Sequence, residues 1–244
     1  MEAPHAEASQ SIAVIITAAG SSTRMGGVKK EYRLLGKDLV DASGKALTVL
    51  GAAASAFALC PHIDTIVITV PQNGEDEARK SLPVSLIGSD KKPLILFVAG
   101  GATRRRSVHQ ALSLLSLYKP SYVLIHDGAR PWLDADLVNR TIEAVRVQKA
   151  VIPCLPLVET PKEIDKNGLI TRHLPRSSIV SAQTPQAFSF KEILEAHELA
   201  AEEELQKGTE YTDDAEVWGC FIGRVAVIPG SLANKKITFL EDLS

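Results

Sequence analysis

Short apolar runs rich in β-branched residues alternate along this chain with longer stretches whose apolar residues recur at helical spacing. The apolar runs predict buried strands at residues 12–17, 65–70, 94–98, 122–125 and 151–153. The helical stretches lie between them, at residues 46–59, 75–80, 107–117 and 133–149. Because strand and helix alternate so regularly, we expect an α/β fold with a doubly wound, mostly parallel sheet.

The pattern changes after residue 153, where closely spaced prolines divide the chain into extended pieces too short to contain crossover helices. Within this region, Asp165 to Gly168 has the composition of a hairpin turn. We therefore expect residues 157–181 to form a β-arm that protrudes from the main sheet.

After the arm, apolar spacing predicts a helix from residue 190 to about residue 206 and a final strand at residues 224–228. The polar segment 37–45 predicts an exposed loop or a small hairpin. Hydrophobic residues make up 45% of the chain, and no repeat or low-complexity linker interrupts the sequence. We therefore expect one domain over residues 1–244.

Charge and composition narrow the classes of partner. The 27 Lys and Arg residues are balanced by 29 Asp and Glu residues, so there is no overall basic field for a nucleic-acid backbone. The 3 cysteines are far apart, which argues against a disulfide framework or a zinc site. Residues 1–11 lack the features of a secretory signal, and no apolar run reaches the roughly 18 residues of a membrane span. These features predict a soluble, cytoplasmic protein that binds neither nucleic acid nor membrane.

The first candidate site follows the first predicted strand, because ligands of doubly wound sheets bind beyond the carboxyl ends of the strands. Residues 18–27 are mostly small, so their backbone N–H groups can approach a phosphate closely. Arg24 and Lys30 would offset triphosphate charge. The segment has neither the P-loop nor the dinucleotide-binding pattern. An ordinary glycine-rich turn with solvated cations remains the alternative.

The third and fourth predicted strands also end in polar motifs. Residues 100–107 form a tight turn that opens a helix, and we expect most of its three successive arginines to be solvated. The fourth strand leads to Asp127 and Arg130, which would bind a hydroxyl or metal-bound water and orient a ligand. A structural ion pair is the alternative for these two residues. His126 has no evident partner in the sequence, which indicates a packed histidine.

Three weaker motifs occur late in the chain, at residues 183–186, 212–215 and 234–238. Thr212 precedes two acidic residues and predicts a helix N-cap. Lys236 follows a strand and a loop, so it is a candidate phosphate ligand, although a solvated lysine is the default for any single case.

Taken together, these motifs carry a family resemblance that spans almost the whole chain. In order they are AAGSSTRMG with KKEY, GGATRRRSV, HDGARP, PLVETPK, LPRSS, QTPQAF, TDDA, and NKKIT followed by EDL. The set resembles the 2-C-methyl-D-erythritol 4-phosphate cytidylyltransferases of the non-mevalonate isoprenoid pathway. The resemblance implies a Rossmann-like nucleotidyltransferase fold. This chain departs from the family's usual pattern at Ala102 and Ala233, where acidic residues are usual, and at Lys29, where proline is usual.

The resemblance also implies roles for individual residues. The catalytic residues would be Arg24, Lys30, Arg176 and Lys236. The nucleotide would lie against Ala18, Ala19, Gly20, Gly100, Gly101, Ala102, Ser107, Asp127 and Gly128. The acceptor would lie against Asp127, Arg130, Thr160, Arg176, Thr184 and Lys236.

The implied reaction transfers CMP from CTP to the sugar-alcohol phosphate and releases pyrophosphate. A divalent cation, Mg²⁺, would bridge triphosphate oxygens, with Asp127 as its carboxylate ligand. The arm would form a homodimer in which Thr160 and Arg176 reach the neighbouring subunit's site. Two alternatives stay open, a ribitol 5-phosphate cytidylyltransferase and a non-catalytic nucleotide-binding homologue. An oxidoreductase is disfavoured, because the first turn lacks the second glycine of the dinucleotide fingerprint.

Overall fold

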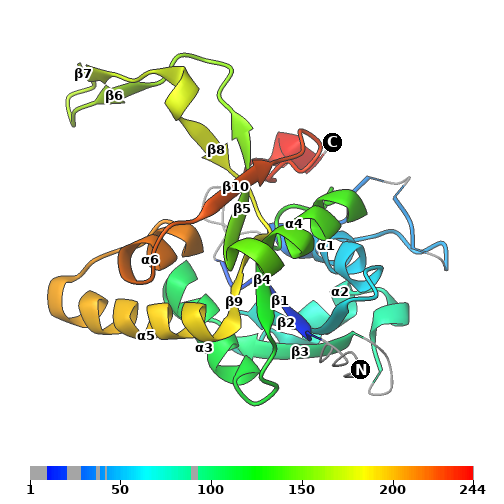
Figure 1. Cartoon of the computed structure of the whole chain (residues 1–244). Coiled ribbons are helices and arrows are strands. Elements are labelled where there is room, and N and C mark those ends of the chain that lie inside the picture. The colour runs from blue at the N-terminus through cyan, green and yellow to red at the C-terminus, as the bar shows by residue number, and fades with distance from the viewer. Residues whose placement is uncertain (1–9, 21–28, 37–38, 42, 89–92, 244) are drawn as a thin grey trace, which may run out of the picture.

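A mixed eight-stranded sheet forms the centre of the computed structural model, which describes residues 10–20, 29–36, 39–41, 43–88 and 93–243 (Figure 1). Seven strands follow one another across the sheet in the order β10-β5-β9-β4-β1-β2-β3, and β8 pairs with β5. Their bounds are β1 Ile12–Thr17, β2 Ile63–Val70, β3 Leu94–Ala99, β4 Tyr122–Asp127, β5 Ala150–Pro156, β8 Val180–Ala182, β9 Gln186–Ser189 and β10 Ala226–Pro229.

The strands β3, β2, β1 and β4 are parallel neighbours, which confirms the predicted parallel sheet. The central residues of β1, β2 and β4 are buried on both faces, as continuous apolar runs require, whereas the residues of β3, at the edge of the sheet, are half-buried. In the register of β1 with β4, Thr17 lies opposite Asp127. The carboxyl ends of these two strands, and the loops that follow them, therefore meet at one edge of the sheet.

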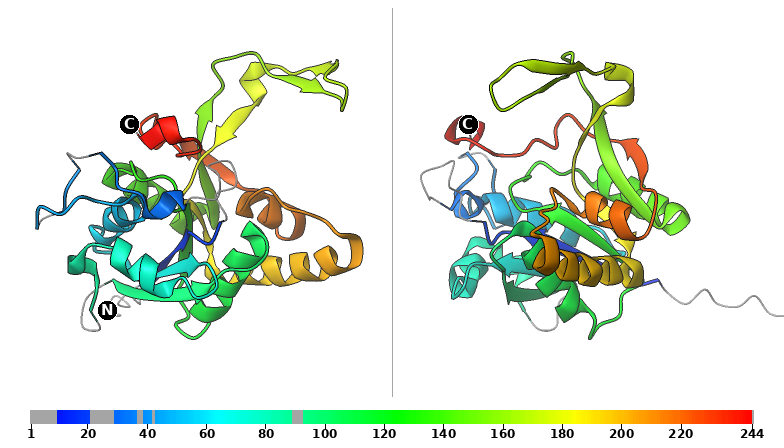
Figure 2. Two further views of the ribbon diagram at one scale, coloured as in Figure 1. Left: turned by 180° about the vertical axis from the view of Figure 1, so that it is seen from behind. Right: turned by 90° about the vertical axis from the view of Figure 1, so that its left-hand side faces the viewer.

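Helices cover both faces of the sheet, so the fold is doubly wound as predicted (Figures 1 and 2). On one face, apolar side chains of α1 (Val49–Ala58), α2 (Glu75–Ser81) and α4 (Ala135–Gln148) pack into the core. On the other, α3 (Arg104–Leu115), α5 (Phe190–Lys207) and α6 (Asp214–Phe221) do the same. Short 3₁₀ turns occur at η2 Lys30–Tyr32, η3 Val84–Leu86, η4 Arg176–Ser178 and η5 Leu240–Leu243.

The sequence did not predict β9, and it indicated α6 only through a candidate N-cap. β9 has four residues beside a proline and runs antiparallel between β4 and β5, which makes the sheet mixed. The N-cap of α6 is Asp213, whose carboxylate accepts from the N–H of Glu216 at 2.9 Å. The prediction that Thr212 is this cap is wrong. Thr212 instead donates its N–H and hydroxyl to the Glu216 carboxylate, each at 2.7 Å.

Between β5 and β8 the chain leaves the main sheet, and residues 157–179 stand off from the rest of the molecule (Figures 1 and 2). Here β6 (Lys162–Ile164) and β7 (Ile170–His173) form a separate two-stranded antiparallel sheet. Asp165 accepts the N–H groups of Asn167 and Leu169 across the turn that joins them. Apolar side chains on and beside this segment are exposed: Val158, Ile164, Leu169, Ile170 and Val180.

The described part of segment 37–45 belongs to a small antiparallel hairpin, in which Val40 pairs with Ala46 and Leu34 with Thr48. Asp41 closes its tip by accepting from the N–H groups of Ser43 and Lys45. None of the described helices combines the length and the apolar composition that crossing a bilayer requires.

Candidate active site

Two loops of small residues touch at the carboxyl ends of β1 and β3. Ala18 donates its N–H to the carbonyl of Thr69 at 3.0 Å, and Gly100 donates to Val70 at 2.8 Å, so β2 fixes both loops. A Cβ added to Gly100 would collide with the Cβ of Ala19. Only glycine at position 100 lets the loops approach this closely.

Ser107 fixes the second loop from within α3. Its hydroxyl accepts the N–H of Gly101 at 3.1 Å and donates to the carbonyl of Thr103 at 2.9 Å. Thr103 caps α3 by accepting from Arg106. The structure thus brings together the residues expected to bind the nucleotide after β1 and β3. Ala102, between Gly101 and Thr103, is exposed and offers no polar side chain.

Lys29 fixes the first loop at its other end. Its ammonium donates to the carbonyls of Ala19 and Gly20, at 3.1 Å for Ala19. Burial lowers the pKa of Lys29, while nearby Glu31 and Glu77 act in the opposite direction. Where the family usually has proline, this chain therefore has a side chain that binds the loop. Arg24 lies outside the described residues.

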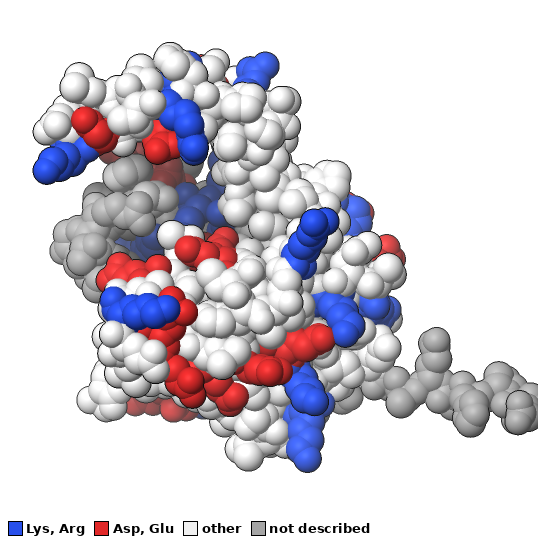
Figure 3. Space-filling model, turned by 60° about the vertical axis from the view of Figure 1, so that its left-hand side comes forward, with Lys and Arg blue, Asp and Glu red and all other residues white. Residues whose placement is uncertain are grey.

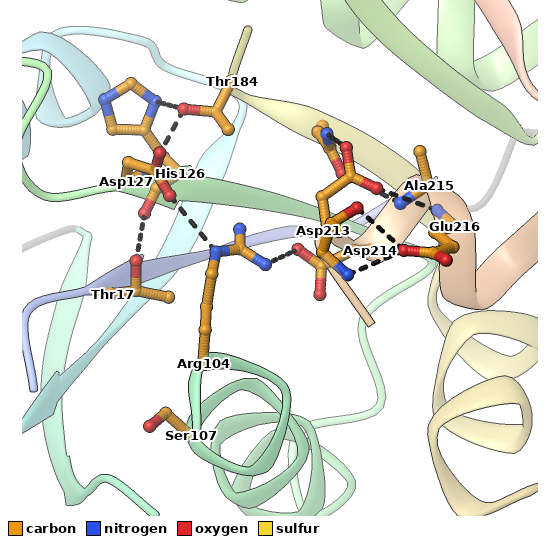
Figure 4. Close-up of polar contacts among 12 residues, drawn as sticks. Thr17, Arg104, Ser107, His126, Asp127, Thr184, Asp213, Asp214, Ala215 and Glu216 are labelled. Atoms are coloured by element: carbon orange, nitrogen blue, oxygen red, sulfur yellow. Dashed lines mark hydrogen bonds and ion pairs between the residues drawn. The ribbon is translucent and has the colours of Figure 1, made fainter. Parts of the chain in front are cut away.

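Three cations surround Asp127, the last residue of β4 (Figure 4). Lys236 Nζ lies 2.7 Å from Oδ2, Arg130 Nε lies 3.8 Å from the same oxygen, and Arg104 Nε lies 3.3 Å from Oδ1. Burial alone would raise the pKa of the Asp127 carboxyl, but Arg104, Lys236 and Arg130 hold it below its usual range. Asp127 is therefore an anion at neutral pH, and the group keeps a net positive charge.

His126 and Thr184 hold the backbone of Asp127 in place. Burial lowers the pKa of His126 to about 4, so its ring is neutral at pH 7. Nε2 lies 3.1 Å from the carbonyl of Arg130, which can only accept, so Nε2 carries the proton. Nδ1 must then accept from the Thr184 hydroxyl at 3.1 Å, and that hydroxyl accepts from the N–H of Asp127 at 3.1 Å. His126 is a structural residue, as its lack of a partner in the sequence indicated.

The C-terminal segment 234–237 binds Lys30 and Arg130 next to the cations around Asp127. The carbonyl of Asn234 accepts from Arg130 Nη1 at 2.7 Å, while the side chain of Asn234 donates to the carbonyl of Thr184 at 2.7 Å. Lys30 is buried and donates from Nζ to the carbonyl of Ile237 at 2.8 Å. Lys30, Arg130 and Lys236 thus come from three distant parts of the sequence to one place.

Other predicted residues are not brought to this group within one chain. Thr160 and Arg176 are both exposed on segment 157–179, and Arg176 donates to the carbonyl of Val158 at 2.6 Å. Within the described part of the chain, no contact joins either residue to Asp127. Gly128 lies beside the site, where a Cβ would come within 2.8 Å of the carbonyl oxygen of Thr17.

Sequence reasoning missed Arg104. We expected most of the three arginines at 104–106 to be solvated, and this is wrong for two of them. Only 6% of the Arg105 side chain is exposed, and it pairs with Glu204. The Arg104 side chain is 27% exposed and contacts both Asp127 and Asp214, the latter at 2.7 Å. Asp214 is 110 positions away, so no local spacing could have revealed the partner.

A divalent ion finds little protein to hold it here. The described residues contain no group of three or more His, Cys, Asp or Glu side chains that would hold a metal ion. Asp127 is the carboxylate at the mouth of the site, and cations already face both of its oxygens. Since Mg²⁺ commonly takes one or two carboxylates together with substrate phosphates, this arrangement fits an ion that arrives with a triphosphate.

A doubly wound sheet whose strand ends carry small-residue loops beside a cluster of cations is the arrangement of a nucleotidyltransferase. The chain belongs to the 2-C-methyl-D-erythritol 4-phosphate cytidylyltransferase family (IspD), which it matches over residues 12–244. It resembles the solved 4-diphosphocytidyl-2C-methyl-D-erythritol synthase of Anaerococcus prevotii, with a TM-score of 0.76 and 29% identity over 97% of this chain and 96% of that one. The solved Francisella tularensis 2-C-methyl-D-erythritol 4-phosphate cytidylyltransferase has a TM-score of 0.73 and 27% sequence identity, over 96% of both chains.

Among curated relatives, the bifunctional enzyme IspD/IspF of Bartonella henselae is 35% identical over 96% of this chain and 55% of its own length. The chain thus spans about half the length of such curated relatives.

Proposed function

We propose that this protein transfers CMP from CTP to 2-C-methyl-D-erythritol 4-phosphate and releases pyrophosphate. One observation carries the proposal. Arg130 and Lys236 lie against Asp127 at the end of β4, and Lys30 joins them through the carbonyl of Ile237, beside the touching loops of small residues. Such a site suits a reaction between a triphosphate and a phosphate, in which charge must be neutralised but no protein nucleophile is needed.

In the proposed reaction, an oxygen of the acceptor phosphate attacks the α-phosphorus of CTP in line with the leaving group. A new P–O bond forms, the bond from the α-phosphorus to the bridging oxygen breaks, and pyrophosphate leaves with that electron pair. Lys30 and Arg24 would stabilise charge on the triphosphate. Lys236 and Arg130 would bind the acceptor phosphate, displacing Asp127 Oδ2 from their side chains.

We propose that Mg²⁺ accompanies the triphosphate, with Asp127 as its protein ligand. The ion would draw negative charge away from the phosphate oxygens. The support is the Asp127 carboxylate, which lies at the end of β4 beside Lys236. Chelation with EDTA should abolish turnover, and Mg²⁺ should restore it.

We further propose a homodimer in which segment 157–179 carries Thr160 and Arg176 to the partner subunit's site. The exposed apolar residues of this segment support the proposal, because a two-stranded ribbon is marginal in water without a surface to bury against. The recess below the segment contains basic side chains (Figure 3), so an added guanidinium there would join an anion-binding surface. Sedimentation equilibrium should give twice the chain mass.

A cytoplasmic location is proposed from the cysteines. All three, Cys60, Cys154 and Cys220, are free thiols, which suits a reducing compartment. Cell fractionation with an antibody against the chain tests this location.

The decisive experiment measures pyrophosphate release from CTP with two acceptors, 2-C-methyl-D-erythritol 4-phosphate and ribitol 5-phosphate. We expect turnover with the first and a much smaller kcat/KM with the second. Equal or faster turnover of ribitol 5-phosphate would assign a different acceptor. CTP binding in calorimetry without pyrophosphate release from either acceptor would contradict an enzymatic role.

A further inference from the structure

Asp214 is a buried acid that the proposed reaction does not use. It begins α6, and only 1% of its side chain is exposed. Its Oδ2 lies 2.7 Å from Arg104 Nη1, and its Oδ1 lies 3.2 Å from Nε2 of the fully buried His197. Burial would raise the pKa of Asp214, but Arg104 and His197 lower it overall. Asp214 is therefore a buried anion, and its partner Arg104 lies between it and Asp127 of the active site.

Arg104 is shared between two carboxylates on different elements. Its Nε lies 3.3 Å from Asp127 Oδ1 at the end of β4, while Nη1 contacts Asp214 on α6 (Figure 4). The guanidinium is planar, so the direction of Nε and the direction of Nη1 are fixed relative to one another. The contact with Asp214 therefore decides where Nε points.

This arrangement matters when the acceptor phosphate binds. Lys236 and Arg130, which would bind that phosphate, face Asp127 Oδ2. Once the phosphate takes these two cations, Arg104 at Oδ1 is the described side chain that still pairs with the carboxylate. A guanidinium fixed by Asp214 resists following either the phosphate or Asp127, because leaving Asp214 unpaired in the interior is costly.

We propose that Asp214 is a positioning residue for phosphate transfer. It acts through Arg104 to keep the Asp127 carboxylate in place while Lys236 and Arg130 bind the acceptor phosphate. The inference rests on the proposed cytidylyltransfer. It assigns Asp214 a role that the TDDA motif alone does not indicate.

The first test compares Asp214→Asn with a matched control, Glu204→Gln. Both changes remove a carboxylate from an α3 arginine, but Glu204 pairs with Arg105 and Arg106, which do not contact Asp127 among the described residues. We expect kcat/KM for the acceptor to fall up to about a hundredfold in Asp214→Asn, since small misplacements of reacting groups cost this much. The Kd for CTP should change less than threefold. Glu204→Gln should lower Tm similarly and leave kcat/KM within about twofold.

The second test asks whether Asp214 acts through Arg104. The double variant Arg104→Gln/Asp214→Asn also removes both charges of the buried pair, so it keeps the test open if Asp214→Asn alone fails to fold. We expect the double variant to be no slower than Arg104→Gln alone. Asp214→Glu, which restores the carboxylate, should recover part of the rate.

The outcomes separate the two proposals. If the unmodified protein does not release pyrophosphate from CTP and the acceptor, the proposed function fails. If it does, but Asp214→Asn loses no more activity than Glu204→Gln, or the losses of Arg104→Gln and Asp214→Asn multiply, the positioning role alone is overturned.

Discussion

The surroundings of Asp127 and the segment 157–179 are stabilised in opposite ways. Around Asp127, Arg104, Arg130 and Lys236 each contact a carboxylate, and His126 and Asn234 are fully buried. In the segment, β6 and β7 pair with each other, and their apolar residues Ile164 and Ile170 are exposed. One chain therefore builds a preorganised electrostatic site by itself, whereas the segment presents surface that a further partner would cover.

The largest loss of activity should come from removing the Lys30 side chain from the site around Asp127. Its ammonium is buried and fixed by the carbonyl of Ile237 at 2.8 Å, so it is preorganised. We expect Lys30→Ala to lower kcat by about a hundredfold to a thousandfold, with smaller changes in either KM. Steady-state pyrophosphate release measures both constants. Lys207→Ala, which removes an exposed lysine from α5, should leave kcat unchanged. An unchanged kcat in Lys30→Ala would contradict the role of Lys30.

The second effect tests whether the two regions belong to one site shared between subunits. Lys30→Ala and Arg176→Ala homodimers should both be nearly inactive, because each of their sites lacks one cation. In the heterodimer, one site carries both changes and the other carries neither. Re-annealing an equal mixture of the two variants should therefore restore about a quarter of the original rate, since half of the dimers have one intact site.

Mass spectrometry of the re-annealed mixture must confirm subunit exchange. The matched control is a mixture of Lys30→Ala with Lys236→Ala. Both lysines would act in the site of their own subunit, so each site of the heterodimer lacks one of them and neither site is intact. Confirmed exchange without recovered activity in the Lys30 and Arg176 mixture would show that Arg176 does not act across subunits.

A third effect concerns the stability of the buried region, through His126. Burial lowers the pKa of His126 to about 4, whereas an exposed histidine titrates near about 6.5. The unfolded chain thus takes up a proton at higher pH than the folded chain. The stability that neutral His126 contributes is complete above about pH 6.5 and is lost as the pH falls through about 4. This difference corresponds to a loss of about 3 kcal/mol at most.

Urea unfolding at several pH values between 7 and 4.5 measures this loss. We expect His126→Gln to have a lower free energy of unfolding at pH 7 and a flatter dependence on pH. His173→Gln, which replaces an exposed histidine on β7, should keep the original dependence. If both variants lose stability with the same slope, His126 is not the group that titrates.

The sequence predicted the strands that carry the site better than the contacts within it. The bounds of β1 are those predicted, and β4 extends the predicted strand by two residues, because continuous apolar runs identify buried parallel strands. β9 escaped notice because four residues after a proline have no recognisable period. The strand matters, since it separates β4 from β5 and makes the sheet mixed.

Within the site, the sequence motifs identified candidate ligand-binding residues. They did not identify the residues that position those side chains. Asp127 and Lys236 stood out at strand and loop ends. Arg104 looked like one of three arginines of which most would be solvated, because its partner Asp214 is 110 positions away, on a helix that the sequence indicated only by a candidate N-cap. Asn234 likewise gains its importance from buried contacts with Arg130 and Thr184 that only the folded chain supplies.

The smallest effect should appear at Ala102, an exposed residue of the turn that leads into α3. Without a polar side chain here, discrimination between CTP and UTP would rest on backbone groups of the turn and on Ser107, which accepts from the N–H of Gly101. A carboxylate at position 102 would accept a hydrogen bond from the amino group of cytosine and repel the carbonyl oxygen of uracil. We expect Ala102→Asp to raise the CTP/UTP ratio of kcat/KM by about three- to tenfold, the value of one exposed hydrogen bond. Ala102→Asn, whose amide can donate or accept, should change the ratio less. Initial rates at limiting concentrations of each nucleotide give the ratio directly. The same ratio in Ala102→Asp and in the unmodified protein would mean that this position does not face the base, and that the loop of Gly100 and Gly101 reads cytosine through its backbone alone.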